Sequence, residues 1–226
     1  MCGRFVSASP AAEVAAYFGA ETGAGVGLAP SYNVAPTNDV YAVLVEEGLR
    51  RLAALRWGLI PPWASDAKIG NRMINARSET VAESNAYRRP FRARRCIVPA
   101  DGFYEWAPVP GERRRQPHYI HRIDGEPLAF AGLWERWKRP EGTPVYSTTI
   151  ITGPANDRIA EVHARMPIVL PPSAWEQWLD PDCDDASALG DLLVPAPSKL
   201  FTFHPVSREV NNPRLKSPHL IEPLAP

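Results

Sequence analysis

Proline is the feature that most limits how this chain can fold, because 25 of its 226 residues are proline. Proline lacks a backbone donor and fixes φ, so it ends helices and is kept out of central strands. Short runs with strand-like composition recur along the chain, at residues 40–46, 50–57, 96–99, 103–107, 118–123, 128–133 and 145–152.

Short helices are predicted between these strands. Ser9 and Pro10 stand where an N-cap and a first helical residue are expected, and Gly19 is a suitable stop. Residues 40–46 and 50–57 flank the turn at 47–49 and form a predicted hairpin. Further helices are predicted after Ser78, at residues 156–162 and at residues 173–179.

These short elements show no regular βαβ alternation. They predict an α+β fold with a curled, barrel-like antiparallel β core and peripheral helices. With 226 residues and 45% hydrophobic content, the chain is long enough for one sizeable core. We expect a single domain over residues 1–210 and an irregular, proline-containing tail over residues 211–226.

The charge balance gives no general sign of a nucleic-acid partner, since 25 Lys and Arg residues face 25 Asp and Glu residues. Arginines do cluster locally, at residues 88–95 and 113–115. Arginine suits bidentate contact with phosphate or carboxylate, but these clusters can equally be solvated faces. The arginines at 113–115, in a loop rich in proline and glycine, are better explained as solvated.

The cysteines indicate a reducing compartment. Cys2, Cys96 and Cys183 are odd in number and lack metal-ligand spacing, so neither a disulfide framework nor a metal site is predicted. No other cofactor is indicated. The chain has no signal-like N-terminus and no stretch long and apolar enough for a membrane span, so a cytoplasmic location without membrane contact is expected. No heptad pattern suggests an oligomer, and a monomer is expected.

Cys2 is the first residue whose chemistry stands out. Removal of Met1 would leave its thiol and its α-amine on adjacent carbons, a pair that condenses with an aldehyde to a five-membered thiazolidine. Gly3 would allow a ligand to approach the backbone, and Arg4 would lower the thiol pKa. The alternative is that Cys2 is an incidental small residue near a frayed terminus.

The segments at residues 56–63 and 75–80 carry a second group of candidates. Trp63 lies in a proline-stiffened loop and would serve as a base-stacking plate or as a core residue. Asn75 and Arg77 place an amide and a guanidinium on one side of an extended segment. For Asn75, within an otherwise apolar run, a hydrogen-bonded buried amide is the structural alternative.

Two further segments offer acid–base groups. Glu105 follows Phe103 on one face of a predicted strand, so its carboxylate has either a raised pKa or a dedicated partner such as an arginine. It would suit proton transfer during Schiff-base chemistry. His163 ends a helical stretch, where a protonated imidazole is favoured, and Arg165 beside it would add an anion contact. A simple helix cap is the alternative for His163.

In this order and spacing, the segments resemble the SOS response-associated peptidase (SRAP) family of abasic-site processing proteins. The resemblance extends to about Pro171 and weakens afterwards. No single segment decides it, but the ordered set is highly specific. The segments that carry it are residues 1–5, 56–63, 75–80, 99–106, 149–156 and 159–167.

The resemblance implies that Cys2, exposed by removal of Met1, captures the ring-opened aldehyde of an abasic site in single-stranded DNA as a thiazolidine crosslink. It further implies that Asn75 holds the reacting N-terminus or the sugar, that Glu105 assists ring opening and proton transfer, and that His163 assists Schiff-base steps and crosslink reversal. Contacts with DNA are implied for Arg4, Trp63, Arg77, Trp106, Thr152 and Arg165.

The implied partner is single-stranded DNA with abasic sites, including sites at single-strand to double-strand junctions. Base-edge readout is not expected, because no recognition helix is evident. Trp63 is the one aromatic residue of its Pro-Trp-Ala stretch, and some relatives have more, so its stacking is less firmly implied than the nucleophile.

Three rival functions fit parts of the sequence. A Cys2 nucleophile with its own α-amine as base is typical of N-terminal-nucleophile hydrolases such as glutamine amidotransferases, but these would leave the arginine and tryptophan segments unexplained. A peptidase that cleaves its own Met1–Cys2 bond is a second alternative. A noncatalytic module that binds single-stranded DNA is the third.

Overall fold

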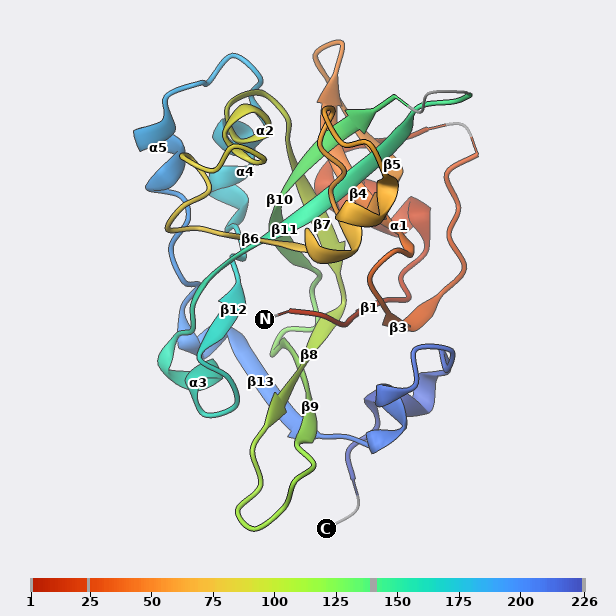
Figure 1. Cartoon of the computed structure of the whole chain (residues 1–226). Helices are drawn as coiled ribbons and strands as arrows, with labels where there is room; N and C mark the ends of the chain where they lie inside the picture. Colours follow the sequence, from red (N-terminus) through yellow and green to blue (C-terminus); the bar gives the residue numbers. More distant parts are fainter. Residues whose placement is uncertain (1, 24, 139–141, 225–226) are drawn as a thin grey trace.

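The computed structural model describes residues 2–23, 25–138 and 142–224, and two β-sheets dominate it (Figure 1). Met1, whose removal is predicted, and the last two residues of the predicted tail lie outside these ranges. The strands are β1 (Phe5–Ser7), β2 (Glu21–Thr22), β3 (Ser31–Val34), β4 (Asp39–Glu46), β5 (Leu49–Trp57), β6 (Asn75–Arg77), β7 (Arg95–Ala100), β8 (Gly102–Ala107), β9 (Gln116–Arg122), β10 (Leu128–Trp137), β11 (Val145–Pro154), β12 (Arg165–Pro167) and β13 (Phe201–Pro205).

The helices are short and lie around the sheets (Figure 1). The α-helices are α1 (Ala11–Phe18), α2 (Arg88–Ala93), α3 (Asp157–Ala160), α4 (Trp175–Leu179) and α5 (Ala186–Gly190). The 3-10 helices are η1 (Ala67–Arg72), η2 (Pro172–Ala174), η3 (Ser198–Leu200), η4 (Arg208–Asn211) and η5 (Pro218–Ile221).

The larger, 8-stranded sheet closes on itself. Its strands follow the order β12, β11, β10, β7, β4, β5, β2, with β6 beside β11. A further pairing joins β11 to β5, so β11, β10, β7, β4 and β5 form a ring. The predicted α+β fold with a barrel-like core is confirmed. The closing pair is parallel, with Thr148 opposite Trp57, whereas the sequence predicted an antiparallel core.

The second, 5-stranded sheet has the order β13, β9, β8, β1, β3. In Figure 1 its strands β8, β9 and β13 lie below the ring, while β1 runs between the two. Phe5 of β1 is opposite Val34 of β3 and Phe103 of β8, and its ring stacks edge-on against Trp57 at 5.0 Å between centroids. The strand that follows Cys2 is therefore held on both edges and packed against the ring.

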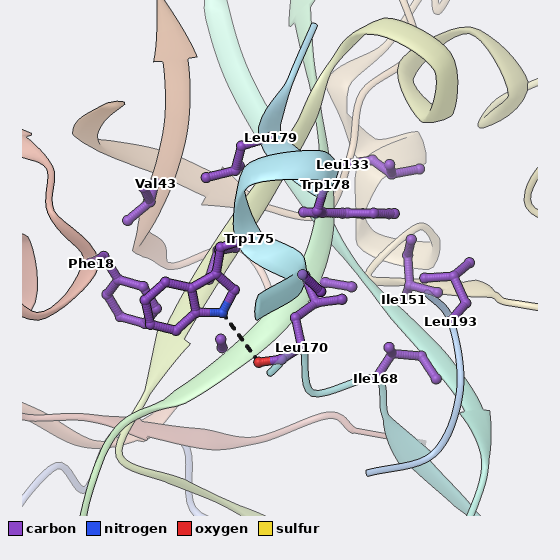
Figure 2. Packing of buried hydrophobic residues seen from close by; sticks show 14 of the residues in the cluster. Phe18, Val43, Leu133, Ile151, Ile168, Leu170, Trp175, Trp178, Leu179 and Leu193 are labelled. Atoms are coloured by element: carbon purple, nitrogen blue, oxygen red, sulfur yellow. Dashed lines mark hydrogen bonds between the residues drawn. The ribbon is translucent and has the colours of Figure 1, made fainter. Parts of the chain in front are cut away.

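The ring buries an apolar cluster against the helices. Figure 2 shows Trp175 of α4 beside Phe18 of α1, and Trp175 Nε1 donates to the Leu170 carbonyl over 3.2 Å. Trp178 is fully buried, and its Nε1 donates to the Cys96 carbonyl over 2.9 Å. Removing such an indole costs roughly 3–5 kcal/mol in other cores. The Trp178 hydrogen bond holds α4 against β7, a strand of the ring.

The hairpin and the first helix follow the predictions. Strands β4 and β5 pair over their whole length around Glu47 and Gly48, both at positive φ, the conformation of a tight two-residue turn. Helix α1 ends at Gly19, which adopts the left-handed conformation. Its start differs in detail: Pro10 takes the N-cap position, and the Ser9 hydroxyl donates to Asp101 Oδ1 over 2.5 Å instead of capping the helix.

The helix predicted after Ser78 begins only at Arg88, ten residues beyond that serine. Residues 78–83 form turns instead, in which Ser84 N donates to the Thr80 carbonyl over 3.0 Å. Serine and threonine side chains compete for backbone groups and so favour isolated turns over continued helix. These turns keep Glu79 on the surface near β6.

The segment after residue 210 packs against the second sheet. Its Leu220 is fully buried with Tyr104 and Val206 in a small apolar cluster. Leu224 N donates to the Pro205 carbonyl over 3.0 Å, and Lys216 Nζ donates to the Asn33 carbonyl. The predicted tail therefore contains η5 and is attached to β3 and β13 by hydrogen bonds.

Candidate functional site

Strand pairing gathers the four predicted catalytic residues from distant parts of the chain. Cys2 precedes β1, which pairs with β8, the strand that carries Glu105. Asn75 begins β6, which pairs in parallel with β11. Strand β12 pairs with β11 as well, in the antiparallel direction. His163 stands two residues before β12. The two sheets therefore meet at the N-terminal strand with these side chains between them.

Asn75 holds the backbone of Cys2. Its Nδ2 donates to the Cys2 carbonyl oxygen over 2.8 Å. The other amide atom, Oδ1, is buried and has no hydrogen-bond partner among the described residues. The Asn75 backbone carbonyl accepts from the Tyr87 hydroxyl over 3.3 Å. The amide is thus fixed on one side, and its buried acceptor remains available for a donor on a ligand or on the N-terminal residue.

The environment of Cys2 reverses one prediction. The residue is fully buried, and burial, together with the negative charge of Glu105, raises the pKa of its thiol well above the usual 9.0. The prediction that Arg4 lowers this pKa through its guanidinium is wrong, because that group points to Asn33 and Val210. The backbone N–H of Arg4 does favour the thiolate, but burial outweighs it. In this conformation the thiol is neutral.

Glu105 and His163 face each other. Glu105 is 2% exposed, and His163 Nε2 lies 4.0 Å from Glu105 Oε2. Burial raises the pKa of Glu105 above 4.5, while the positive charge of protonated His163 opposes the rise. The charge of Glu105 also acts on Cys2, so Glu105 interacts electrostatically with both His163 and Cys2. A carboxyl group with a raised pKa is suited to donate and accept protons near neutrality.

The ring of His163 has a backbone partner in either protonation state. Its Nδ1 lies 3.0 Å from both the backbone nitrogen and the carbonyl oxygen of Arg165. The neutral ring accepts from the N–H, and the protonated ring donates to the carbonyl. His163 follows α3, with its own N–H bonded to the Ile159 carbonyl over 2.9 Å. The helix predicted over residues 156–162 is shorter than expected, since α3 ends at Ala160 and His163 lies three residues beyond it.

Arg4 makes internal contacts in this structure. Its Nη1 donates to Asn33 Oδ1 over 3.0 Å and to the Val210 carbonyl over 2.8 Å. Asn33 is fully buried, and its Nδ2 donates to the carbonyls of Val210 and Asn212 over 3.1 Å and 3.0 Å. These bonds tie β1 and β3 to the C-terminal segment. Arg4 thereby links the residues just before β1 to the C-terminal segment.

Arg165 and Thr152 also contact each other. Arg165 Nη1 and Nη2 donate to the two carboxylate oxygens of Glu79 over 2.7 Å and 3.0 Å, and Nη2 donates to the Thr152 carbonyl over 2.7 Å. The Thr152 side chain is fully buried, and its hydroxyl faces the Ala76 carbonyl at 3.4 Å. Thr152 therefore supports Arg165 through its backbone, and its hydroxyl does not reach the surface here.

The other three residues with predicted DNA contacts lie toward solvent. Arg77 is exposed at the end of β6. Trp63 is 62% exposed, which excludes the core alternative for this residue. Trp106 follows Glu105 on β8, and its Nε1 donates to Asn211 Oδ1 over 2.9 Å. It lines a depression of about 630 Å³ together with three arginines, among them Arg115.

Neither a metal centre nor a membrane span is found among the described residues. No group of three or more His, Cys, Asp or Glu side chains within residues 2–23, 25–138 and 142–224 is placed to hold a metal ion. Within the same ranges, no helix is both long and apolar enough to cross a bilayer.

Comparison with known proteins identifies the family. Residues 1–213 match the family described as SOS response associated peptidase, or SRAP. The chain belongs to the SRAP family. It is 42% identical over 223 residues to the abasic site processing protein YoqW of Bacillus subtilis, with 98% of this chain and 99% of the relative covered. It is 32% identical to the abasic site processing protein HMCES of Rattus norvegicus, with 86% of this chain and 65% of HMCES covered.

Solved structures share the SRAP chain's fold. A crystal structure of a protein from Bacteroides thetaiotaomicron has a TM-score of 0.87 at 23% identity and covers 99% of this chain and 100% of that protein. One from Bordetella bronchiseptica has a TM-score of 0.76 at 28% identity and covers 91% of this chain and 100% of that protein. At 23% identity, the similarity to the Bacteroides thetaiotaomicron protein concerns the fold alone.

Sequence reasoning missed two residues of the site. Glu79 lies in the segment that was singled out with Asn75, yet its pairing with Arg165 spans 86 residues and leaves no local signal. Asn33 is a buried amide within a short strand. An amide in a strand-like run is the pattern that singles out Asn75, and the same pattern could have identified Asn33. Glu79 and Asn33 each bind an arginine of this SRAP chain that was predicted to contact DNA.

Proposed function

We propose that this protein processes abasic sites in DNA by forming a covalent thiazolidine crosslink through Cys2. The arrangement of Asn75, Glu105 and His163 around Cys2 is the observation that supports it, above all the 2.8 Å hydrogen bond from Asn75 to the Cys2 carbonyl. The named relatives are abasic site processing proteins, which gives the substrate. Removal of Met1 is part of the proposal, because the α-amine of Cys2 must be free to react.

The proposed reaction has two bond-forming steps. The Cys2 amine attacks the aldehyde carbon of the open abasic sugar, and loss of one water gives a Schiff base. Loss of water after protonation of the hydroxyl leaves the Schiff base protonated on nitrogen. The Cys2 sulfur then adds to the same carbon, the nitrogen keeps its proton, and the thiol proton replaces the one given to the hydroxyl. The product is a five-membered ring, and the net change is the loss of one water molecule. Closing that ring needs no further group, since both nucleophiles belong to one residue.

Glu105 and His163 supply the protons. With its pKa raised by burial, Glu105 in the acid form would donate to the departing hydroxyl and then, as the carboxylate, accept the thiol proton. This second transfer matters because the buried thiol of Cys2 is neutral. His163, 4.0 Å from Glu105, would return protons to Glu105 and assist the reverse reaction. Asn75 would fix the backbone of the nucleophile and use its buried Oδ1 as an acceptor.

The proposal assigns single-stranded DNA to the surface around this site. Trp63 and Arg77 are exposed, and a stacking plate with nearby guanidinium groups is typical of sequence-independent binding to single strands. Covalent capture does not require a strongly basic surface, in keeping with the balanced charge of the chain. Action as a cytoplasmic monomer, with single-strand to double-strand junctions among the substrates, belongs to the same proposal.

Intact mass spectrometry tests the function. The protein is mixed with a single-stranded oligonucleotide carrying one abasic site, beside an undamaged oligonucleotide and two variants, Cys2→Ala and Cys183→Ser. We expect a one-to-one adduct, lighter by one water than the sum of its parts and lacking Met1, that needs no borohydride. It should form with Cys183→Ser and fail with Cys2→Ala. No adduct from a protein that already lacks Met1 would refute crosslinking and favour an N-terminal-nucleophile amidotransferase.

A further inference from the structure

Glu79 occupies a position that the proposed chemistry does not explain. It lies on the surface just after β6, and its side chain is 45% exposed. Its two oxygens accept from Nη1 and Nη2 of Arg165 over 2.7 Å and 3.0 Å. This bidentate pair joins two segments that are 86 residues apart in sequence.

Glu79 occupies the anion-binding side of the Arg165 guanidinium. Nη2 of Arg165 also donates to the Thr152 carbonyl, and Nε of Arg165 is buried. The Nη1 and Nη2 fork is therefore the part that faces a ligand. Carboxylate and phosphate both bind such a fork through two oxygens, so they compete for the same donors. A phosphate that approached Arg165 would also be repelled by Glu79, since both carry negative charge.

Protonation does not open the pair at ordinary pH. Hydrogen bonding to Arg165 lowers the pKa of Glu79 to about 2. Glu79 is consequently an anion over the whole range in which DNA is bound. The backbone nitrogen of Arg165 in turn donates to His163 Nδ1 over 3.0 Å, so the residue that binds Glu79 is also bound to a candidate catalytic side chain.

We propose that Glu79 is a specificity-determining residue that acts as an internal competitor of the DNA backbone for Arg165. The inference rests on the proposed function, because it takes a phosphate of the single strand as the ligand of Arg165. With Glu79 in place, an undamaged strand gains little from Arg165 and leaves quickly. A strand with an abasic site is retained because the bond to Cys2 holds it while the phosphate displaces the carboxylate. Glu79 thus lowers noncovalent affinity for every strand and makes retention depend on the lesion.

Binding of an undamaged oligonucleotide tests this role without any covalent step. Fluorescence anisotropy would follow a labelled oligothymidylate titrated with the full chain across a series of salt concentrations. The variants are Glu79→Gln, which keeps the shape and removes the charge, and Glu79→Ala. Glu83→Gln is the matched control, because it removes the same charge from an exposed side chain in the same stretch of turns.

We expect both Glu79 variants to bind the undamaged strand several-fold more tightly than wild type. The slope of log affinity against log salt should steepen by about 0.7, as for one added phosphate contact on a single strand. Glu83→Gln should change binding much less. The gain from Glu79→Gln should also disappear in the Arg165→Ala background, because the competition requires that guanidinium.

Two results would overturn the inference. One is that Glu79→Gln binds no more tightly than Glu83→Gln, or more weakly than wild type, which would make Glu79 a support for Arg165. The other is an equal gain in the Arg165→Ala background, which would reflect net charge alone. Mass spectrometry with the abasic oligonucleotide separates this failure from failure of the proposed function. Wild-type protein that forms the adduct while Glu79→Gln shows no gain refutes only the role of Glu79.

Discussion

Asn75 Nδ2 lies 2.8 Å from the carbonyl oxygen of Cys2, across 73 residues of sequence, and donates a hydrogen bond to it. Strand β6 is fixed in turn by its parallel pairing with β11, where Asn75 is opposite Ile150. Cys2 is therefore positioned by the larger sheet, while the strand that follows it belongs to the smaller one. Cys2 lies where the two sheets meet.

Replacing Asn75 by alanine should slow adduct formation far more than it weakens the fold. Loss of the bond frees the Cys2 backbone, and a displacement of about 1 Å from the reactive geometry costs on the order of 10²-fold in rate. One lost hydrogen bond costs only about 1 kcal/mol of stability. Gel-shift kinetics with the abasic oligonucleotide and urea denaturation measure the two effects. Asn85→Ala, an exposed amide, is the control, and equal adduct rates for the two variants would contradict the positioning role.

Much of the architecture could be predicted because its signals are local. The β4 and β5 hairpin follows from two strand-like runs around Glu47 and Gly48, and the end of α1 follows from Gly19. Ring closure could not be predicted in this way, since the parallel contact of Thr148 with Trp57 joins strands far apart in sequence and has no turn to mark it.

The candidate site divides along the same line. Residue types and family resemblance identified Cys2, Asn75, Glu105 and His163, and the structure brings them together. The protonation state of Cys2 could not be predicted, because it depends on burial, which only the packed structure determines. Arg4 is close to Cys2 in sequence, but the side-chain charge that raises the pKa of the Cys2 thiol is that of Glu105.

Stability should fall with rising pH because of Glu105. Burial raises its pKa above 4.5, so the folded protein keeps a proton that the unfolded chain releases. Its contribution is complete below pH 4.5 and is lost as the pH rises through the folded pKa. Glu105→Gln cannot ionise, so its free energy of unfolding should exceed that of wild type by an amount that grows with pH above 4.5.

Urea denaturation of both proteins between about pH 4 and pH 8 measures this difference. Glu83→Gln provides the control, since its carboxylate is exposed and should give a nearly constant difference. Parallel curves for wild type and Glu105→Gln would mean that Glu105 ionises in the folded protein as it does in the unfolded chain.

Alkylation should distinguish Cys183 from the two buried thiols. Cys2 and Cys96 are buried, and burial raises the pKa of Cys96 from 9.0 to about 12 and that of Cys2 above its usual value as well. Since the thiolate is the reactive form, a rise of three units reduces it about 10³-fold near neutral pH. Iodoacetamide should therefore label Cys183, which is partly exposed, long before Cys96.

Peptide mapping by mass spectrometry follows the labelling over time, and a urea-denatured sample shows that all three peptides are detectable. In chains that keep Met1, Cys2 should react as slowly as Cys96. Cys2 labelling as rapid as that of Cys183 in those chains would show that the thiol reaches solvent in the folded protein and would argue against its burial.

Asn33 should prove essential to both stability and reaction, although it touches no reacting atom. Its side chain is fully buried and accepts from Arg4 while donating to the carbonyls of Val210 and Asn212. Asn33→Ala would remove these bonds and leave buried polar groups without partners, at a cost of about 3 kcal/mol. Urea denaturation measures that loss, with Asn85→Ala as the control.

The same substitution should slow adduct formation because β3 pairs with β1, the strand that follows Cys2. The Arg4 side chain would lose its hydrogen bond to Asn33 Oδ1, and the C-terminal segment would lose the two bonds that the Asn33 amide donates to Val210 and Asn212. A chain truncated after residue 206 lacks Val210 and Asn212 and should show the same slow reaction. Full adduct rates in both proteins, measured where they remain folded, would mean that β8 alone positions the nucleophile. Slow rates in both would make the C-terminal segment part of the reactive site, since it would then fix the position of β1, the strand that follows Cys2.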